Sequence, residues 1–249
     1  MRSALLSLER LLLPNSCVSC GRLVEQSRPE GLVCSLCVAR LRPLPAGCRR
    51  CRQPMPPVGP CRFCSQWPSS LRWAASAVWL GDEAREIIHH LKYEGYTRLA
   101  GMAAEVMARL IPHPGSARLV PIPLAPNRQR RRGYNQASEL AASLGSLWSL
   151  PVARGLIERV RETETQTELT LRERIANVAG AFVAAQPDLR GIAAQPSSQT
   201  DVQIILIDDV LTTGATISAA AAALEDVGWS CVGAVSFARA LPLTVRVES

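Results

Sequence analysis

Two adjacent aspartates, Asp208 and Asp209, stand between an aliphatic run at 204–207 and a small, hydroxyl-rich turn. Such a run is typical of a strand buried on both faces of a parallel sheet. We therefore expect the carboxylates at the strand's carboxyl end, where open α/β sheets bind ligands. The turn consists of small residues: Thr212, Thr213, Gly214, Ala215 and Thr216. With a helix predicted behind it, the turn can close its N–H groups around a phosphate. The two acids beside it can hold sugar hydroxyls or a metal.

Thiol groups suited to metal binding are concentrated at the amino end. They form four Cys-x-x-Cys pairs: Cys17 and Cys20, Cys34 and Cys37, Cys48 and Cys51, Cys61 and Cys64. Each pair can place two sulfurs on a tetrahedral Zn²⁺ at about 2.3 Å, and two pairs complete a closed structural site. One or two structural zinc ions are predicted, and metal binding would supply much of this segment's folding energy. Sequential pairing is the simplest arrangement, and interleaved pairing stays open.

A disulfide framework or a redox motif is the alternative for these cysteines. Disulfides need an oxidising compartment. Residues 1–13 are not predicted to be an export signal, because Glu9 and Arg10 interrupt them and no small-residue cleavage site follows. We expect a short amphipathic helix there. Thioredoxin-like pairs stand at a strand-to-helix junction, whereas these lie among Pro, Gly and Arg. Cys231 lies in an apolar stretch and is predicted to be a buried strand residue.

Charge is distributed unevenly along the 249 residues, of which 47% are hydrophobic. Residues 1–70 hold ten arginines and three acids and so carry the whole net charge of +7, while residues 71–249 are balanced. Taken alone, such a basic segment is typical of a protein that binds nucleic acid. Eight zinc-bound thiolates would reduce it to about +3. No apolar run approaches the ~18 residues that span a bilayer, so no membrane span is predicted.

The elements that must position these residues alternate along the chain. Apolar patterns predict strands at 74–80, 119–124, 181–185, 202–207 and 231–237, and helices at 84–91, 99–110, 137–144 and about 215–227. Residues 186–201 are rich in Gln, Pro and Ser and are predicted to form a surface loop. Alternation of this kind predicts an α/β fold with a parallel sheet flanked by helices. A zinc module at 1–70 and an α/β domain at 71–249 are the predicted domains.

The segment 204–216 resembles the signature of the type I phosphoribosyltransferases, which bind 5-phosphoribosyl-1-pyrophosphate (PRPP). In that family the acids contact the ribose hydroxyls and the turn holds the 5′-phosphate. The resemblance thus implies ribose binding by Asp208 and Asp209 and phosphate binding by residues 212–216. A buried strand that ends in a solvated acidic turn is the alternative. Neither Gly-x-x-x-x-Gly-Lys nor a Gly-x-Gly-x-x-Gly following a strand is present.

Further segments extend the resemblance over nearly the whole chain, to the ComF (ComF/GntX) family with its amino-terminal double zinc ribbon. They are the cysteine pairs and residues 91–95, 120–124, 130–136 and 163–167, with Arg172, Arg174 and Asn177. Members of this family are associated with DNA uptake in natural transformation. The resemblance therefore implies a bacterial cytoplasmic protein that handles incoming single strands.

PRPP also carries a pyrophosphate, so the resemblance calls for positive charge opposite the acids. Lys92 and a flexible basic loop at 128–136 are the candidates, with Arg130, Arg131 and Arg132 as pyrophosphate contacts and Gly133 as hinge. Closure of the loop would exclude water from the reactive sugar. The alternatives are a solvated helix end for Lys92 and an exposed basic loop for the arginines. Mg²⁺ is expected with PRPP, and together they would stabilise departing pyrophosphate while an unidentified nucleophile attacks C1′.

Two non-catalytic hypotheses stand beside the transferase. In one, the zinc segment and the basic loop bind single-stranded DNA, and Phe63, Trp67 and Trp73 are the aromatics near the zinc segment. In the other, the zinc module docks a DNA-uptake helicase. His89, His90 and His113 have no partner visible in the sequence and are expected at the surface. The acceptor substrate, the oligomeric state and catalysis itself stay open at this point.

Overall fold

The protein, represented by a computed structural model, is described for residues 16–24, 31–45, 47–54, 61, 63–162, 177–185 and 203–240. Its centre is a four-stranded sheet in the order β1-β6-β5-β2, with every pair parallel. The strands are β1 (Leu71–Trp79), β2 (Ala117–Pro121), β5 (Gln203–Leu211) and β6 (Val232–Arg239). β3 (Ile157–Arg159) and β4 (Phe182–Ala184) form a separate antiparallel pair. The predicted parallel sheet is confirmed.

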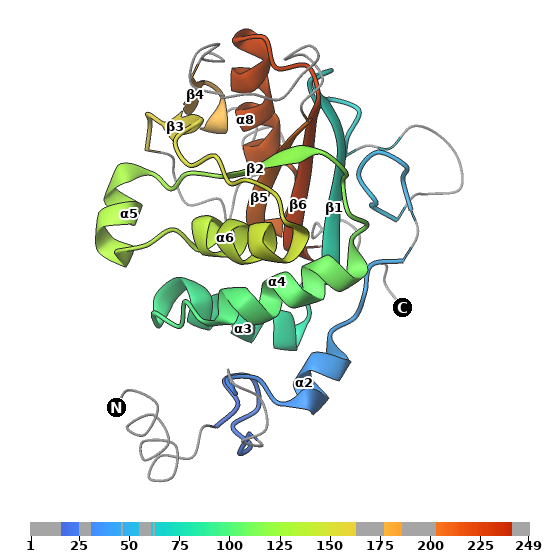
Figure 1. Ribbon diagram of the computed structural model, residues 1–249, viewed down its shortest axis with the longest axis vertical. Helices are drawn as coiled ribbons and strands as arrows, with labels where there is room; N and C mark the ends of the chain where they lie inside the picture. Colours follow the sequence, from blue (N-terminus) through green and yellow to red (C-terminus); the bar gives the residue numbers. More distant parts are fainter. Residues whose placement is uncertain are drawn as a thin grey trace.

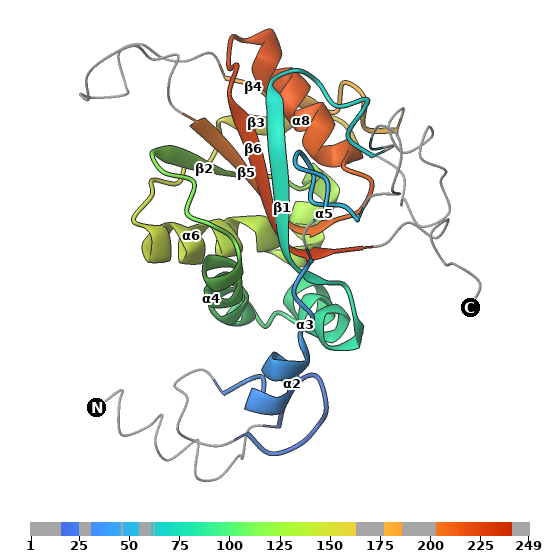
Figure 2. The same cartoon turned by 90° about the vertical axis from the view of Figure 1, so that its right-hand side faces the viewer.

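Helices cover both faces of the sheet (Figures 1 and 2). One face carries α3 (Asp82–Tyr93), α4 (Leu99–Leu110) and α6 (Gln136–Trp148), and the other carries α8 (Ala215–Asp226). Side chains of β5 alternate between the faces: Ile205 and Ile207 pack on the α4 and α6 side, and Ile204 and Leu206 on the α8 side. All four are fully buried, which explains why the run is continuously apolar.

The paired aspartates lie inside a strand rather than at its end, so the predicted boundary at Ile207 is wrong. β5 continues to Leu211 because it stays paired with β6 as far as Arg239. β2 stops earlier, at Pro121, opposite Ile207. The carboxylates therefore lie just beyond the end of β2, between neighbouring strands whose following helices pass to opposite faces. A crevice of this kind is where ligands bind in open α/β sheets.

The basic segment forms a helix, α5 (Pro126–Arg132), where we predicted a flexible loop. Pro126 stands in the first helical turn, where its missing N–H is harmless, and Arg and Gln are good helix formers. Gly133 ends the helix with φ 79° and donates its N–H to the Gln129 carbonyl. Gly133 thus has the left-handed conformation of a helix C-terminal cap.

The chain between the second and third cysteine pairs runs along the outer edge of β1. The Trp79 N–H donates to Arg42 O over 2.8 Å, and the Leu44 N–H donates to Ala77 O over 3.3 Å. Pro43 faces Val78 in the antiparallel bridge between them. Residues 42–44 therefore cover the β1 edge of the sheet, which would otherwise present unpaired backbone groups.

Several predictions fall on residues outside the described ranges: the helix at 1–13, the segment 163–167, Arg172 and Arg174, and the loop at 186–201. Cys231 is partly exposed and directly precedes β6, so it is not the buried strand residue that we predicted. Within the described ranges, we find no helix with both the length and the apolar character that crossing a membrane requires.

Candidate functional site

The centre of the candidate site is an ion pair between the buried Asp209 and the partly buried Lys92, the chain's single lysine. Asp209 is 2% exposed, and its Oδ2 lies 2.5 Å from Lys92 Nζ. Its Oδ1 accepts a hydrogen bond of 3.0 Å from Gln136 Nε2. Gln136 Oε1 in turn accepts from Arg132 Nη1. The carboxylate is thus joined to α3 through Lys92 and, through Gln136, to the last residue of α5.

The two aspartates have opposite shifts in pKa. Burial, followed by the negative charge of Asp209, raises the pKa of Asp208 to about 8. Burial would raise the pKa of Asp209 too, but the charge of Lys92 and the hydrogen bonds from Lys92 and Gln136 outweigh it and lower that pKa. Burial disfavours the ammonium of Lys92, yet Asp209 raises its pKa overall. Asp209 is therefore held in its ionised form, while Asp208 keeps its proton to a higher pH than an ordinary carboxyl group.

The turn after β5 presents backbone donors at the start of α8. Gly214 has φ 83°, a left-handed conformation that favours glycine, and it directly precedes the helix. Among the described residues, none accepts a hydrogen bond from the backbone N–H of Thr212, Thr213, Gly214, Thr216 or Ile217. The Ala215 N–H reaches Thr213 Oγ1 at 3.4 Å. Donors left free at a helix N-terminus form an anion site.

The predicted cations take different positions. Lys92 is paired with Asp209, as just described, so it is not a solvated helix end. Arg132 contacts Gln136 and lies over the Tyr93 ring, with 5.3 Å from Cζ to the ring centroid. Arg130 is exposed and contacts Asn127 of its own helix, and Arg131 is exposed beside it. The structure therefore brings Lys92 and Arg132 to the acids and leaves Arg130 and Arg131 on the outer surface.

Asn135 and Gln136 lie in the predicted loop at 128–136 but were given no role there, and Arg159 was outside the predicted site. Gln136 bridges Arg132 and Asp209. Asn135 caps α6 by accepting from the Ala137 N–H over 2.9 Å, and its Nδ2 donates to Ile122 O over 2.9 Å. Arg159 of β3 lies near enough to Asp208 for their charges to interact. Asn before an apolar pattern is a recognisable cap signal, but no local signal shows what Gln136 or Arg159 touches.

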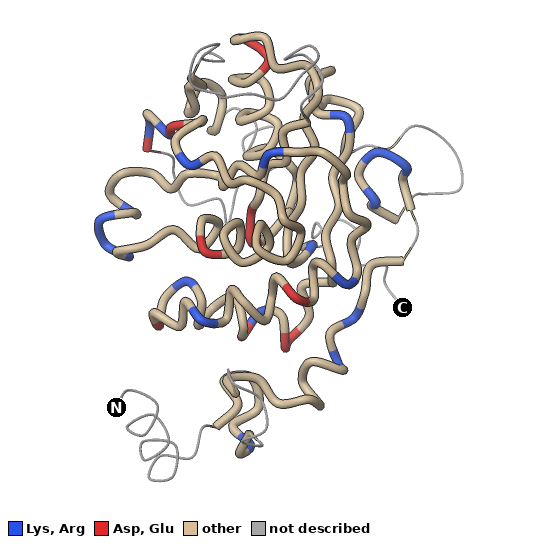
Figure 3. Tube along the Cα trace, viewed as in Figure 1, with Lys and Arg blue, Asp and Glu red and all other residues tan. Residues whose placement is uncertain are grey.

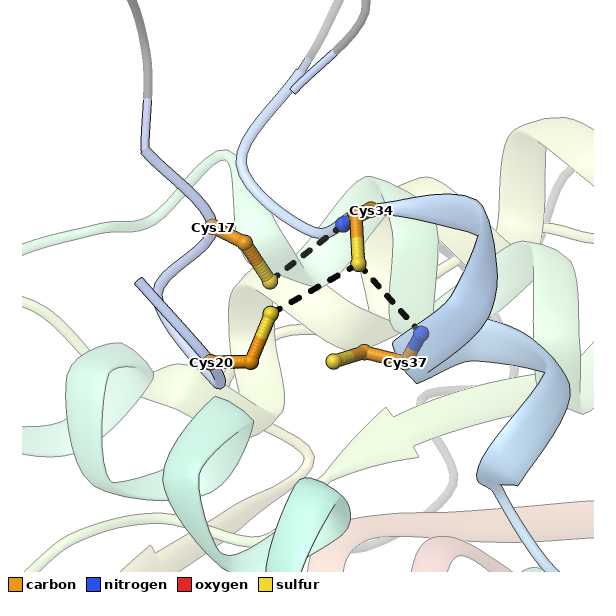
Figure 4. A group of neighbouring side chains, drawn as sticks. All are labelled: Cys17, Cys20, Cys34 and Cys37. Atoms are coloured by element: carbon orange, nitrogen blue, oxygen red, sulfur yellow. Dashed lines mark hydrogen bonds between the residues drawn. The ribbon is translucent and has the colours of Figure 1, made fainter. Parts of the chain in front are cut away.

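The eight amino-terminal cysteines form two separate groups of four. One contains Cys17, Cys20, Cys34 and Cys37 (Figure 4), and the other contains Cys48, Cys51, Cys61 and Cys64. This sequential pairing was left open by the sequence. In each group the sulfurs all lie within 4.8 Å of one another. Separations of 3.8, 3.6 and 3.5 Å between Sγ atoms are close to the edge of a tetrahedron with Zn–S bonds of about 2.3 Å. Both groups therefore fit a metal ion.

The first pair of each group has the same backbone turn. Cys17 N–H donates to Arg22 O and Gly21 N–H to Cys17 O, over 2.7 and 2.8 Å. In the second group, Cys48 N–H donates to Gln53 O and Arg52 N–H to Cys48 O, over 2.8 and 2.7 Å. The residue after each pair has positive φ, 71° at Gly21 and 57° at Arg52. The repeated turn directs both sulfurs of a pair to one point, as a metal knuckle requires.

Comparison with known proteins agrees with this geometry. The phosphoribosyl transferase domain family matches residues 130–248. DNA utilization protein YhgH of Salmonella typhi is 30% identical over 200 residues, which cover 75% of this chain and 81% of that protein. Competence protein ComFC of Bacillus subtilis is 28% identical over 212 residues, 81% of each chain. Competence protein F of Haemophilus influenzae is 32% identical over 122 residues, 49% of this chain and 50% of that protein. The chain belongs to the ComF family within the phosphoribosyltransferase superfamily.

Proposed function

We propose that this protein binds PRPP, or a closely related ribose phosphate, at the crevice between β2 and β5. The observation that carries the proposal is the turn 212–217, whose free backbone N–H groups stand beside two carboxylates. The turn would take the 5′-phosphate, and Asp208 and Asp209 would take the ribose hydroxyls. Lys92, paired with Asp209, holds that carboxylate in place and offsets part of its charge.

Metal ions complete the proposal. The two cysteine groups would each hold a Zn²⁺. These ions would be structural, because four thiolates leave no coordination position open for a substrate. Mg²⁺ would accompany PRPP and supply charge stabilisation for its pyrophosphate. Asp208 is suited to assist, since its proton is held with a pKa near 8 and is easily displaced by a nearby cation. Pyrophosphate contact by Arg130, Arg131 or Arg132 and transfer to an acceptor belong to the same proposal.

Calorimetric titration of PRPP with Mg²⁺ tests ribose-phosphate binding. We expect wild-type protein to bind and the double variant Asp208→Asn/Asp209→Asn to lose at least about tenfold in affinity, since a lost charged contact costs about 1.5–3 kcal/mol. Asp226→Asn, at the exposed end of α8, is the matched control and should bind like wild type. Equal binding by wild type and the double variant would remove the assignment of the acids.

A second function, binding of single-stranded nucleic acid, is favoured by aromatic side chains near α5. Tyr93 is 68% exposed and Tyr96 is 41% exposed. Tyr93 contacts the His89 ring and Tyr96 the His90 ring. Arg132 stacks on Tyr93, and Figure 3 shows basic residues of α5 at the adjoining end of the molecule. Exposed aromatic faces beside arginines provide stacking and phosphate contacts for a single strand. The zinc segment is less suitable, because Trp67 is buried.

Fluorescence anisotropy with a labelled oligodeoxythymidine tests this second function. The double variant Tyr93→Ala/Arg131→Ala should bind at least tenfold more weakly, because a lost stacked base costs about 1–3 kcal/mol. Wild-type affinity should also fall steeply with salt. Arg109→Ala, an exposed arginine of α4, serves as control. Unchanged affinity in the double variant would exclude this surface.

The names of the relatives indicate the process in which such binding would act. We infer a role in DNA uptake, because relatives similar over most of this chain are called competence or DNA utilization proteins. A zinc module at 1–70, a transferase-like domain at 71–249, a cytoplasmic location and contact with a DNA-uptake helicase are further parts of this proposal that the family resemblance implies.

A further inference from the structure

The second cysteine group, Cys48, Cys51, Cys61 and Cys64, is built into the core of the α/β fold. Its four side chains are at most 8% exposed. They share a hydrophobic cluster with Leu211 and with Ile217 and Ala220 of α8. Leu211 directly precedes the turn at 212–216, which we call the phosphate turn. The first group packs instead with the α3 and α4 side of the molecule, and its Cys20 is exposed. The second group thus shares its cluster with residues on both sides of the turn at 212–216.

Arg50 connects the two cysteine pairs of the second group. It lies between Cys48 and Cys51 and donates from Nη1 to Cys64 O over 2.9 Å. Its Nη2 donates to Pro68 O and Leu71 O, both over 2.8 Å. Its guanidinium also lies 5.7 Å from the centre of the Trp67 ring. The position of Trp67 therefore depends on the knuckle formed by Cys48 and Cys51.

Trp67 packs directly against the phosphate turn. It follows Cys64 by three residues, its N–H donates to Cys64 O over 3.3 Å, and its side chain is 7% exposed. A Cβ atom built on Gly214 would come within 2.8 Å of Trp67 Cζ2 and Nε1. The indole therefore lies against the Gly214 backbone, at the residue that sets the conformation of the turn.

A buried arginine makes a second connection between the metal group and the same turn. Arg239, 0% exposed, ends β6 opposite Leu211, the residue before Thr212. Its Nε donates to Gln53 Oε1 over 2.9 Å, and its guanidinium lies within electrostatic reach of Cys51, Cys61 and Cys64. Four thiolates on Zn²⁺ carry two negative charges, which Arg239 partly balances.

We propose that the metal at the second cysteine group holds Trp67 against Gly214 and so positions the phosphate turn for its ligand. Metal retention at this group and ligand binding at the turn are then thermodynamically coupled, and the coupling is reciprocal. Trp67 is a positioning residue in this arrangement. The naming of the ligand rests on the proposed function, but the contact between Trp67 and Gly214 does not.

Release of zinc to a chromogenic chelator tests the metal side of the coupling on the full-length protein. The Cys34→Ser and Cys61→Ser variants assign the release phases to the first and second groups. Gly214→Ala should displace Trp67 and speed release from the second group about fivefold or more, leaving the first group unchanged. Gly145→Ala controls for the steric clash alone, since its added Cβ would meet Val152 Cγ2 at the same 2.8 Å on the other face of the sheet, at a residue without positive φ.

The ligand side is tested with PRPP and Mg²⁺. PRPP should slow zinc release from the second group only, and Trp67→Leu should weaken PRPP binding about fivefold or more. Trp148→Leu, equally buried at 7% but on α6, should leave PRPP affinity unchanged. Unaltered second-group release in Gly214→Ala overturns the coupling. If wild-type protein binds no PRPP, the proposed function fails, and the Gly214→Ala release rates still decide the coupling.

Discussion

Two neighbouring carboxyl groups, Asp208 and Asp209, illustrate how residue environment separates equivalent side chains. Asp209 is ionised because Lys92 and Gln136 contact it, whereas Asp208 is protonated up to a pKa of about 8 through burial and its neighbour's charge. The sequence predicts that both acids face the ligand, but the contact with Lys92 links residues more than 100 positions apart. No local pattern encodes such a contact, so the difference between the acids required the structure.

The pKa of Asp208 predicts how the stability of the ligand-free protein depends on pH. A carboxyl group that holds its proton more tightly when folded stabilises the fold at low pH, and this contribution is lost between about pH 4 and 8. The free energy of unfolding of wild type minus that of Asp208→Asn should therefore fall from pH 6 to 8, by at most about 1.4 kcal/mol per unit. Denaturant unfolding of zinc-loaded protein measures it. A flat difference would contradict the shifted pKa of Asp208.

Removing only one partner of the Asp209–Lys92 ion pair should destabilise the protein. Asp209→Asn leaves Lys92 without its partner and should destabilise the protein by about 2 kcal/mol, less than a fully buried pair because Lys92 keeps some exposure. Lys92→Met added to Asp209→Asn should restore part of that loss without restoring ligand binding. Chemical denaturation of the three proteins provides the measurement. A double variant less stable than Asp209→Asn would show that the pair is not what stabilises this site.

At the level of elements, the sequence predicts the strands of the central sheet and the helices that pack on it. Two features near the site differ from the prediction. Hydrophobic periodicity identified α3, α4, α6 and α8, because each buries one apolar side. The basic segment has no apolar side, so its sequence predicts a loop, although Pro126 and Gly133 mark the ends of α5. The apolar pattern also predicts that β5 ends too early, because pairing with β6 extends the strand through Asp208 and Asp209.

Asn135 connects two of these elements. It caps α6 and also donates to the Ile122 carbonyl beyond β2, so it fixes the start of the helix on which Gln136 stands. Asn135→Ala should lower stability by about 1 kcal/mol and weaken PRPP binding as well. Asn135→Asp keeps the capping oxygen and loses only the donor, so it should retain most of the stability. Thermal unfolding and calorimetry measure the two effects, and equal loss in both variants would refute the capping role.

Across the whole molecule, the two cysteine groups make unequal contributions to stability. The second group is buried within the core beside α8, while the first lies near α2 (Ser35–Arg40) and has an exposed member. Figure 1 shows this amino-terminal part below α3, apart from the sheet. The sequence predicts eight equivalent ligands, because the pairs look alike. Their difference arises from tertiary packing against the sheet.

Single serine substitutions should reveal this inequality. Cys51→Ser removes a buried ligand of the second group and should lower the melting temperature of the main transition by roughly 10 °C, as expected for a loss of about 3–4 kcal/mol in a chain of this size. Cys20→Ser should lower it by only a few degrees and instead make residues 16–45 sensitive to protease. Differential scanning calorimetry with mapped proteolysis compares them. Equal shifts in melting temperature would show that both groups support the core alike.

The short stretch at 42–44 has a practical consequence for anyone who wishes to isolate the α/β part of the chain. Its backbone pairs with the rim of β1, so a chain shortened to begin at residue 71 would uncover a long strand with open donors and acceptors. Such a fragment would self-associate through that rim and precipitate at concentrations where the intact protein does not. Residues 42–44 therefore also keep the β1 edge from pairing with another molecule.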